Sequence, residues 1–275
     1  MKYSIVIPRC GGGAEYEGDP AVGCARADVE ILDGRGKNPG EARNEALARA
    51  QGEWIVYCDA DDRLFPAILP VLDRLIAEHP SADLIRYGSV ESGRMLVLPQ
   101  LWQYAYRRSA FGDLRFPGLC MGEDLLYLEQ CLRQAQEIVE THEVGYEHIV
   151  HRGSLTHRRP SRTIVLDTLA FTVTYLRRIG DGEPRTSYTR FGLSTRLTEH
   201  VADWILQLPR DERADVWRQW FAALRDRSLK LTPWANFGRK VLSFAPSRIL
   251  AVVLFVLPHK LKLLRSALLF KKPLK

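Results

Sequence analysis

Apolar and polar positions follow two different periods over the first part of the chain. Short β-branched runs, residues 3–8 (YSIVIP) and 54–58 (WIVYC), predict buried strands. Residues 38–52 instead place alanine and leucine at helical spacing, with Asn38 as the cap and Pro39 in the first turn. Strands that alternate with helices predict an α/β fold with a mostly parallel sheet flanked by helices.

Further elements follow from the same two periods. We expect strands at residues 28–32, 82–90 and 138–151, and helices at residues 66–80 and 122–136. Residues 98–111 show neither period clearly and are expected to be helical or irregular. From about Ser161 the pattern turns helical, which predicts a C-terminal helical extension. We therefore divide the chain into a body (1–160), a helical extension (161–232) and a tail (233–275).

Composition is that of an ordinary globular protein, because 46% of the 275 residues are hydrophobic and 26% are charged. The cysteines are odd in number and form no Cys-x-x-Cys pair: Cys10, Cys24, Cys58, Cys120 and Cys131. This argues against a disulfide framework or a cysteine-rich zinc site and favours a reducing compartment. The apolar run at the N-terminus is too short for a signal peptide, so we expect a cytoplasmic protein.

Charge is distributed unevenly along the chain. From Arg227 to Lys275 there are eleven basic residues and no acid. Since the whole chain carries +6, the remaining residues carry a net −5. The basic tail points to an anionic partner, either nucleic acid or anionic lipid.

Three aspartates stand directly after the predicted strand at residues 54–58. Asp59 and Asp61 are two residues apart and can hold one divalent cation, Mn²⁺ or Mg²⁺, with substrate phosphates supplying further oxygen ligands. Strand ends of this kind border the crevice in which open α/β sheets bind ligands. The alternative is a solvated acidic turn, with Asp62 capping the helix that starts near Pro66.

The order of several short motifs resembles the nucleotide-sugar half of the family 2 glycosyltransferases, whose fold is called GT-A. These motifs are the first strand, Ala42-Arg43-Asn44, Gly52-Glu53, Asp59-Ala60-Asp61-Asp62, Gly122-Glu123-Asp124 and the segment HRGSLTH at 151–157. The resemblance extends from residue 3 to about residue 157. It implies a GT-A (Rossmann-like) catalytic domain over residues 1–160.

The resemblance also implies roles for single residues. Asp124 would be the base that deprotonates the acceptor, with inversion at the anomeric carbon. The apolar helix face beside Asp124 would favour its protonated form, and the helix N-terminus its ionised form. Arg43 would direct a fixed positive charge toward the nucleotide, unless it is a surface arginine facing solvent. Glu123 and Asp124 could also be no more than acids of a first helical turn.

Nucleotide and metal contacts of the family would fall on a few other residues. Pro8 and Asp33 are expected, with Arg43 and Asp59, to contact the nucleotide donor. His151 would be the third metal ligand, with His157 as the alternative. Asp33 would recognise the base from a shortened second strand, because residues 9–41 are too few for the family's usual elements. This shortening leaves open whether the chain still binds a donor.

The tail combines basic residues with aliphatic ones. The apolar run 249–257 cannot span a bilayer, which needs about 20 residues. In 260–270 leucines alternate with lysine and arginine, which suits a segment lying on an anionic membrane surface. A nucleic-acid partner is not expected, since few aromatic residues accompany the basic ones. The alternative is a helix packed on the body with its lysines solvated.

These observations predict a metal-dependent inverting glycosyltransferase. It would sit in the cytoplasm, peripherally on the inner face of the cell membrane, and move one sugar from a nucleotide-sugar donor (a UDP-sugar) to a lipid-linked or polysaccharide acceptor. Bacterial surface glycan biosynthesis is the expected setting. No Gln-x-x-Arg-Trp motif follows the body, so non-processive transfer is expected. The alternatives are a non-catalytic GT-A-like binding protein and another metal-dependent phosphate enzyme, such as a nucleotidyltransferase or a dehalogenase-type phosphatase.

Overall fold

The computed structural model describes residues 1–10, 19–96, 99–150, 159–178, 196–229, 231–244 and 248–257. These residues divide into two compact units: those up to His157 form the first, and those from Arg158 onward form the second. His151, His157, the three glycines at 11–13 and the end of the tail lie outside the described residues. The three-part division at residues 160 and 232 stays a prediction.

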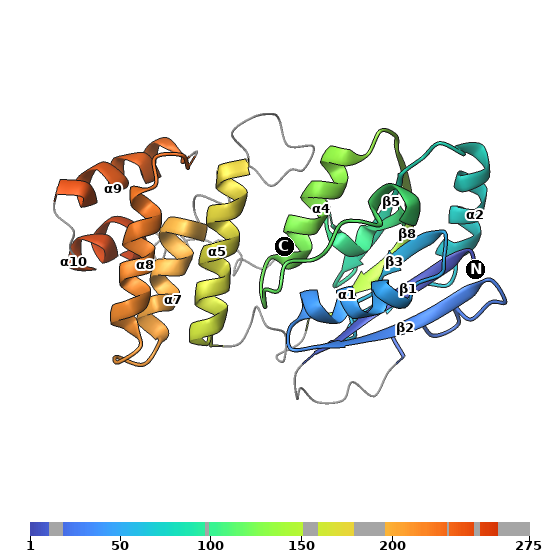
Figure 1. The fold of residues 1–275 in the computed structure, drawn as a ribbon, viewed down its shortest axis with the longest axis horizontal. Helices are drawn as coiled ribbons and strands as arrows, with labels where there is room; N and C mark the ends of the chain where they lie inside the picture. The colour runs from blue at the N-terminus through green and yellow to red at the C-terminus, as the bar shows by residue number, and fades with distance from the viewer. Residues whose placement is uncertain are drawn as a thin grey trace, which may run out of the picture. The chain divides into compact units, whose positions relative to one another are not determined.

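The first unit is an α/β structure built on one sheet (Figure 1). Its strands are β1 (Tyr3–Cys10), β2 (Val29–Gly36), β3 (Trp54–Tyr57), β4 (Arg63–Leu64), β5 (Leu84–Glu91), β6 (Arg94–Met95), β7 (Tyr104–Arg107) and β8 (Ile138–His148). Its helices are α1 (Pro39–Arg49), α2 (Ile68–Glu78), the 3₁₀ turn η1 (Leu101–Gln103), α3 (Arg108–Phe111) and α4 (Glu123–Gln134).

The sheet has the order β2-β1-β3-β7-β5-β8-β4, with β6 beside β5. Pairing is parallel between β1 and β2, between β1 and β3, and between β5 and β8. The other pairs are antiparallel. Strand β7 runs against both of its neighbours, β3 and β5, and the β4-β8 and β5-β6 pairs are antiparallel as well. The sheet is therefore mixed, and the parallel arrangement predicted from the sequence holds for its β2-β1-β3 part and for the β5-β8 pair.

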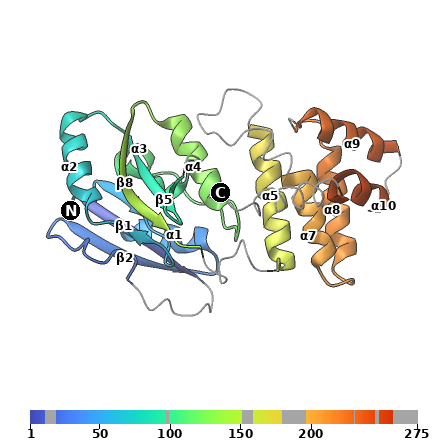
Figure 2. The same ribbon diagram turned by 180° about the vertical axis from the view of Figure 1, so that it is seen from behind.

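Alternating side chains of the central strands supply two apolar layers. Ile5 of β1 and Val56 of β3 pack with α2 on one face. Val6 and Tyr57, one residue further along each strand, pack with α1 and α4 on the other. The two pictures from opposite sides show these helices covering the sheet (Figures 1 and 2). Both faces of β1 and β3 are thus buried, which explains their continuous apolar sequences.

Helix α1 begins as its sequence predicts. The Asn38 side chain accepts a hydrogen bond of 2.8 Å from the backbone N–H of Glu41, and Pro39 occupies the first turn. Close packing then sets α1 against β2, because a Cβ added at Gly34 would lie 2.0 Å from the Ala42 carbonyl oxygen. Only glycine at this position allows that approach.

The segment 98–111 departs from its prediction of helical or irregular structure. It contains the strand β7, whose residues Tyr104–Tyr106 are buried between β3 and β5. Burial on both faces removes the polar alternation that would have revealed a strand. The expected strands and helices on either side of this segment are present, with ends that differ by a few residues.

The second unit is helical throughout its described part. It contains α5 (Arg162–Arg178), the π-helical turn η4 (Arg196–His200), α7 (Val201–Gln207), α8 (Arg213–Arg225), α9 (Pro233–Phe244), α10 (Arg248–Ala251) and the π-helical turn η5 (Val252–Val256). The Trp220 indole N–H donates to the Leu197 carbonyl at 2.7 Å, and its ring meets Phe255 edge-on. The described residues contain no helix that has both the length and the hydrophobicity needed to span a bilayer.

Asp73 of α2 fastens that helix to the start of β1. Its carboxylate accepts hydrogen bonds from Lys2 Nζ (2.6 Å), the Tyr3 hydroxyl (2.9 Å) and Arg26 Nη1 (2.8 Å). Burial alone would raise the pKa of Asp73, but these three donors outweigh burial and lower it to about 2. The cluster therefore favours the ionised carboxylate in the folded state.

We expect Asp73→Asn to lower the free energy of unfolding at pH 7 by about 1–2 kcal/mol, after allowance for solvent screening. The folded-state pKa lies below the unfolded value of about 3.9, so this contribution is present above that value and is lost as the pH falls toward 2. Urea denaturation at pH 7, 5, 4 and about 3 would measure it. Glu78→Gln, in an exposed pair on the same helix, is the control. A difference that stays constant from pH 7 to 3 would contradict the assignment.

Candidate active site

Asp59 lies just beyond the end of β3, beside the end of β1. The Cys58 N–H donates to the Val6 carbonyl at 3.0 Å, so the parallel pairing of β1 and β3 continues to the residue before Asp59. Ile55 and Tyr57 face α1 and α4, and the period of two predicts the same side for Asp59. The contacts of Asp59 agree with this side.

Arg43 connects three elements at this strand end. It extends from α1, and its Nη2 donates to Asp59 Oδ1 at 2.7 Å. Its Nη1 donates to Oε1 of Glu123, the first residue of α4, at 2.6 Å. The guanidinium also lies over the Phe116 ring, 5.4 Å from the centroid, and only 4% of the arginine is exposed. The alternative of a solvent-facing Arg43 is therefore wrong, while a contact with the nucleotide stays a prediction.

Several carboxylates lie near one another around Arg43. Burial raises the pKa of Asp59, Arg43 opposes this shift, and the charges of Asp61 and Asp124 reinforce it. Burial and then the neighbouring charge of Asp124 raise the pKa of Glu123 to about 7, again against Arg43. The Arg43 guanidinium thus binds two carboxylates, Asp59 and Glu123, whose pKa values burial and the neighbouring acids raise.

The start of α4 gives Glu123 and Asp124 different environments. Gly122 precedes the helix with φ of 83°, a left-handed conformation that glycine adopts at little cost. Glu123 is buried and held by Arg43, so it is more than an acid of a first helical turn. Asp124 is partly exposed, and its Oδ1 accepts a hydrogen bond of 2.8 Å from the Leu125 N–H. Of the two acids, Asp124 is thus the more accessible.

Asp62 is buried on the side of the loop away from Arg43. Its Oδ2 accepts from the Tyr146 hydroxyl at 2.7 Å, and its Oδ1 from the Ile149 N–H at 2.8 Å. The same hydroxyl accepts from the Asp59 N–H at 3.0 Å. Burial and the charge of Asp59 raise the pKa of Asp62 to about 7, while the hydrogen bonds from Ile149 and Tyr146 lower it in part. Asp62 therefore connects the aspartate loop to β8. The alternative, in which Asp62 caps α2, is wrong, because the N-cap of α2 is Ala67.

Tyr146 is held in place by its aromatic neighbours. Its ring stacks on Trp102 with centroids 4.3 Å apart, and His148 lies on the same indole at 5.8 Å. His148 Nδ1 in turn lies 2.6 Å from Glu91 Oε2. Neither Tyr146 nor Asp62 stood among the site residues expected from the sequence. Strand β8 offered no motif that would have singled out its tyrosine.

The remaining predicted site residues lie in separate places. Pro8 is buried in β1 opposite Gly34 of β2. Asp33 is an exposed residue of β2, and Arg9 Nε donates to its Oδ1 at 2.8 Å. No hydrogen bond between Asp33 and Arg43 or Asp59 occurs in the part of the chain that the structure describes. The predicted ligand His151 follows Ile149 by two residues and is not described, and its role stays a prediction.

Asp59 and Asp61 have the chemistry of a divalent-cation site. They offer the hard carboxylate oxygens that Mn²⁺ and Mg²⁺ prefer, and they lie close enough that the charge of Asp61 raises the pKa of Asp59. Among the residues that the structure describes, no group of three or more His, Cys, Asp or Glu is arranged to hold a metal ion. Phosphates of a substrate would have to complete the ligand set.

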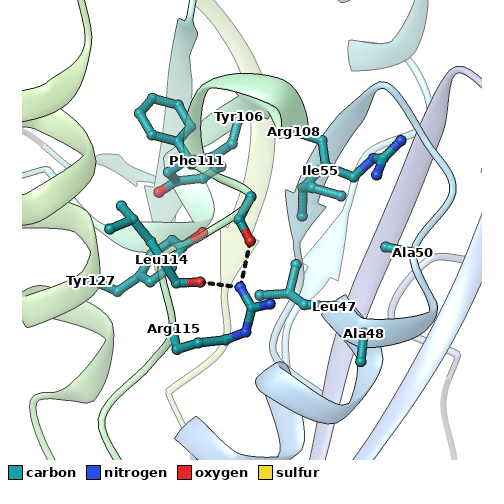
Figure 3. A pocket seen from close by; sticks show the side chains of 11 residues that line it. Leu47, Ala48, Ala50, Ile55, Tyr106, Arg108, Phe111, Leu114, Arg115 and Tyr127 are labelled. Atoms are coloured by element: carbon teal, nitrogen blue, oxygen red, sulfur yellow. Dashed lines mark hydrogen bonds between the residues drawn. The ribbon is translucent and has the colours of Figure 1, made fainter.

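A small cavity of about 200 Å³ lies elsewhere on the same face of the sheet. Ile55, Tyr106 and Tyr127 line its inner wall, and the side chain of Arg115 bonds the Gly112 and Leu114 carbonyls at its rim (Figure 3). Ile55 is four residues before Asp59, or roughly 13 Å along the strand. This cavity is separate from the carboxylate cluster.

We expect Arg43→Met to lower the free energy of unfolding by about 3–5 kcal/mol, because it leaves Asp59 and Glu123 buried without their counter-charge. Arg43→Lys should recover only part of this loss, since one ammonium cannot reproduce both bonds of the guanidinium fork. Urea denaturation would measure both variants. Arg49→Met, on the exposed side of the same helix, is the matched control and should cost less than about 1 kcal/mol. Equal losses at the two positions would contradict the role given to Arg43.

We expect Tyr146→Phe to destabilise the chain by about 2–3 kcal/mol at pH 8.5, because it removes a hydrogen bond to the ionised and buried Asp62. Tyr87→Phe is the matched control, since that buried hydroxyl donates at 2.8 Å to a neutral carbonyl, that of Trp102. Its loss should be about 1 kcal/mol. Chemical denaturation would measure both variants, and a Tyr146 effect no larger than the Tyr87 effect would contradict the role given to the hydrogen bond between Tyr146 and Asp62.

Comparisons with known proteins agree with this geometry. Residues 26–122 match the model of glycosyl transferase family 2, a range that contains Arg43, the aspartate loop and Gly122. No curated protein matches the chain in sequence.

Solved structures of TarS from S. aureus share the fold. The fragment 1–349 in complex with UDP-GlcNAc has a TM-score of 0.56 at 17% identity, covering 91% of this chain and 90% of the fragment. The same fragment with UDP gives 0.51 at 16% identity, covering 83% and 82%. A longer TarS structure gives 0.53 at 16% identity, covering 90% of this chain and 53% of that one. The family model thus matches part of the first unit, and the fold of the chain is similar to that of the TarS glycosyltransferase structures.

Proposed function

We propose that the chain transfers one sugar from a nucleoside-diphosphate donor to an acceptor hydroxyl, with inversion at the anomeric carbon. The observation that carries this proposal is the cluster of Asp59, Glu123 and Asp124 around the buried Arg43, at the strand ends of a GT-A sheet. Open α/β sheets bind their ligands at this edge. A UDP-sugar is the proposed donor, because the TarS structures of the same fold contain UDP-GlcNAc and UDP.

Asp124 is the proposed base. It accepts the proton of the acceptor hydroxyl while that oxygen forms its bond to the anomeric carbon, and the bond from this carbon to the diphosphate breaks. Its partial exposure leaves it accessible, whereas Glu123 is committed to Arg43. Arg43 and Glu123 position the start of α4 relative to Asp59.

Asp59 and Asp61 are the proposed holders of Mn²⁺ or Mg²⁺, with His151 as a third ligand. A bound divalent cation supplies Lewis-acid stabilisation to the departing diphosphate. The Ile149 N–H bond to Asp62 supports this assignment, because it fixes the chain two residues before His151 beside the aspartate loop. Pro8 and Asp33 are the proposed nucleotide contacts of β1 and β2.

The proposed acceptor is a lipid-linked or polysaccharide glycan of the bacterial surface, extended by one sugar at a time. The tail, residues 233–275, is proposed to bring the cytoplasmic chain to the inner face of the membrane. The tail contains nine basic residues and no acidic one, which supports contact with an anionic surface.

Donor binding can be tested by thermal unfolding with a panel of nucleoside diphosphates, with and without Mn²⁺. UDP with Mn²⁺ at about one hundred times its Kd should stabilise the fold by about 2.7 kcal/mol, which raises Tm by several degrees. Asp61→Ala should abolish the Mn²⁺-dependent part, whereas Asp113→Ala, at an exposed acid outside the cluster, should keep it. If no nucleotide raises Tm, the donor proposal is overturned, and a non-catalytic binding protein that no longer binds a nucleotide is favoured.

Asp124→Asn then separates an enzyme from a binding protein. We expect it to reduce UDP release from a UDP-sugar about 10²- to 10⁴-fold, with a mixed fraction of lipid-linked glycans as the acceptor. The Tm rise with UDP and Mn²⁺ should persist, because the donor contacts remain. Unchanged turnover would exclude Asp124 as the base.

A further inference from the structure

Helix α9 exposes two large aromatic side chains on one stripe. Trp234 is 48% exposed and Phe237 is 51% exposed, and their ring centroids lie 5.6 Å apart. Lys240, three residues further along the same stripe, is also exposed. Trp217 and Trp220 of the neighbouring helix α8 are, by contrast, buried. A tryptophan and a phenylalanine side by side in water indicate a surface that meets an apolar partner.

A second apolar stripe lies on the neighbouring helical segment of the same unit. Ile249, Val253 and Leu257 are all exposed and are spaced four residues apart along α10 and η5. This segment packs against α9 through Phe255, since a Cβ added at Gly238 of α9 would lie 2.1 Å from that ring. The labelled ribbon shows α9 and α10 at the same end of the second unit (Figures 1 and 2).

The charge around both stripes has one sign. Lys240 and Arg248 are exposed beside them, and no acid occurs anywhere from Arg227 onward. Asp226, the last acid before that point, is engaged by Arg177 and by Ser228. The surface thus joins aromatic, aliphatic and cationic side chains without a single carboxylate from this part of the sequence.

We propose that these two stripes form a docking face for an anionic lipid bilayer. The docking face consists of Trp234, Phe237, Lys240, Arg248, Ile249, Val253 and Leu257. Its aromatic rings would enter the headgroup region, where tryptophan is favoured, and its basic residues would meet lipid phosphates. Neither helix is long enough to span a bilayer, so the face would lie on the membrane surface.

This inference rests on the proposed membrane contact of the tail, residues 233–275, and deepens it by assigning the contact to particular side chains of α9, α10 and η5. The sequence pattern did not single out Trp234 and Phe237. Only the structure shows that both side chains are exposed and adjacent on α9. Charge complementarity selects an anionic bilayer over a second copy of the chain, because two such faces would bring like charges together. Lipid binding is measured without turnover, so its failure and the failure of glycosyl transfer are distinguishable.

Sedimentation of the full chain with lipid vesicles tests the docking face. The chain should bind vesicles that contain phosphatidylglycerol, and much less those of phosphatidylcholine alone. Trp234→Ser with Phe237→Ser should weaken binding to the anionic vesicles at least about tenfold. The matched control replaces two exposed apolar residues of the first unit, Ile31→Ser with Met95→Ser, and should bind as the wild type does. Circular dichroism would verify that all variants are folded.

A variant at the end of the tail, called the tail variant below, separates the docking face from the last residues of the chain. Leu261→Ser with Leu264→Ser and Leu268→Ser leaves the docking face intact and should retain binding that depends on Trp234 and Phe237. If the tail variant removes all binding while Trp234→Ser with Phe237→Ser removes none, the proposal is overturned. Self-association that disappears in the aromatic variant, together with no vesicle binding, would also overturn it and assign the face to a second copy.

Brominated lipids give a direct readout of insertion. Quenching of tryptophan fluorescence by brominated phosphatidylglycerol should occur in the wild type and fall in Trp234→Phe. That conservative variant should still sediment with the vesicles, because phenylalanine preserves most of the apolar surface. Quenching that is the same in both proteins would place α9 away from the bilayer and refute the docking face.

Discussion

The double ion pair of Arg43 is the interaction on which the rest of the site depends. One guanidinium holds Asp59, at the end of β3, and Glu123, at the start of α4. Both partners would otherwise be carboxylates at the edge of an apolar core, where unpaired charge is costly. The pair therefore fixes the distance between the aspartate loop and Asp124, although Arg43 itself faces away from bulk water.

Strand geometry decides which acids can share that arginine. The period of two places Ile55, Tyr57 and Asp59 on the face covered by α1 and α4. Asp62 is bound to Tyr146 and Ile149 of another part of the unit. The loop is consequently anchored twice, once through a charge pair and once through a hydrogen-bonded hydroxyl. Asp61 lies between these two anchored residues in the sequence and is partly exposed.

Local sequence predicted much of the fold and singled out Arg43, Asp59 and Asp124, but it revealed little of the way these residues are connected. Continuous apolar runs and the Asn38-Pro39 start revealed β1, β3 and α1, because these signals are short-range. Strand β7 was missed, since a strand buried on both faces loses its alternation. The pairing of Arg43 with Glu123 spans 80 residues, and no pattern of spacing encodes a contact between separate elements.

The charge balance also constrains how a donor could bind under the proposed function. A nucleoside diphosphate is itself anionic, and in the proposed site it would lie beside the carboxylates of Asp59, Asp61 and Asp124. Two like charges 4 Å apart repel by about 4 kcal/mol at an effective dielectric constant of 20. A diphosphate beside this loop would meet several such repulsions unless a divalent cation accompanied it. Donor and cation should therefore bind with positive coupling, each raising the affinity of the other. The same carboxylates that repel a lone diphosphate would then make the loop selective for the diphosphate together with its cation.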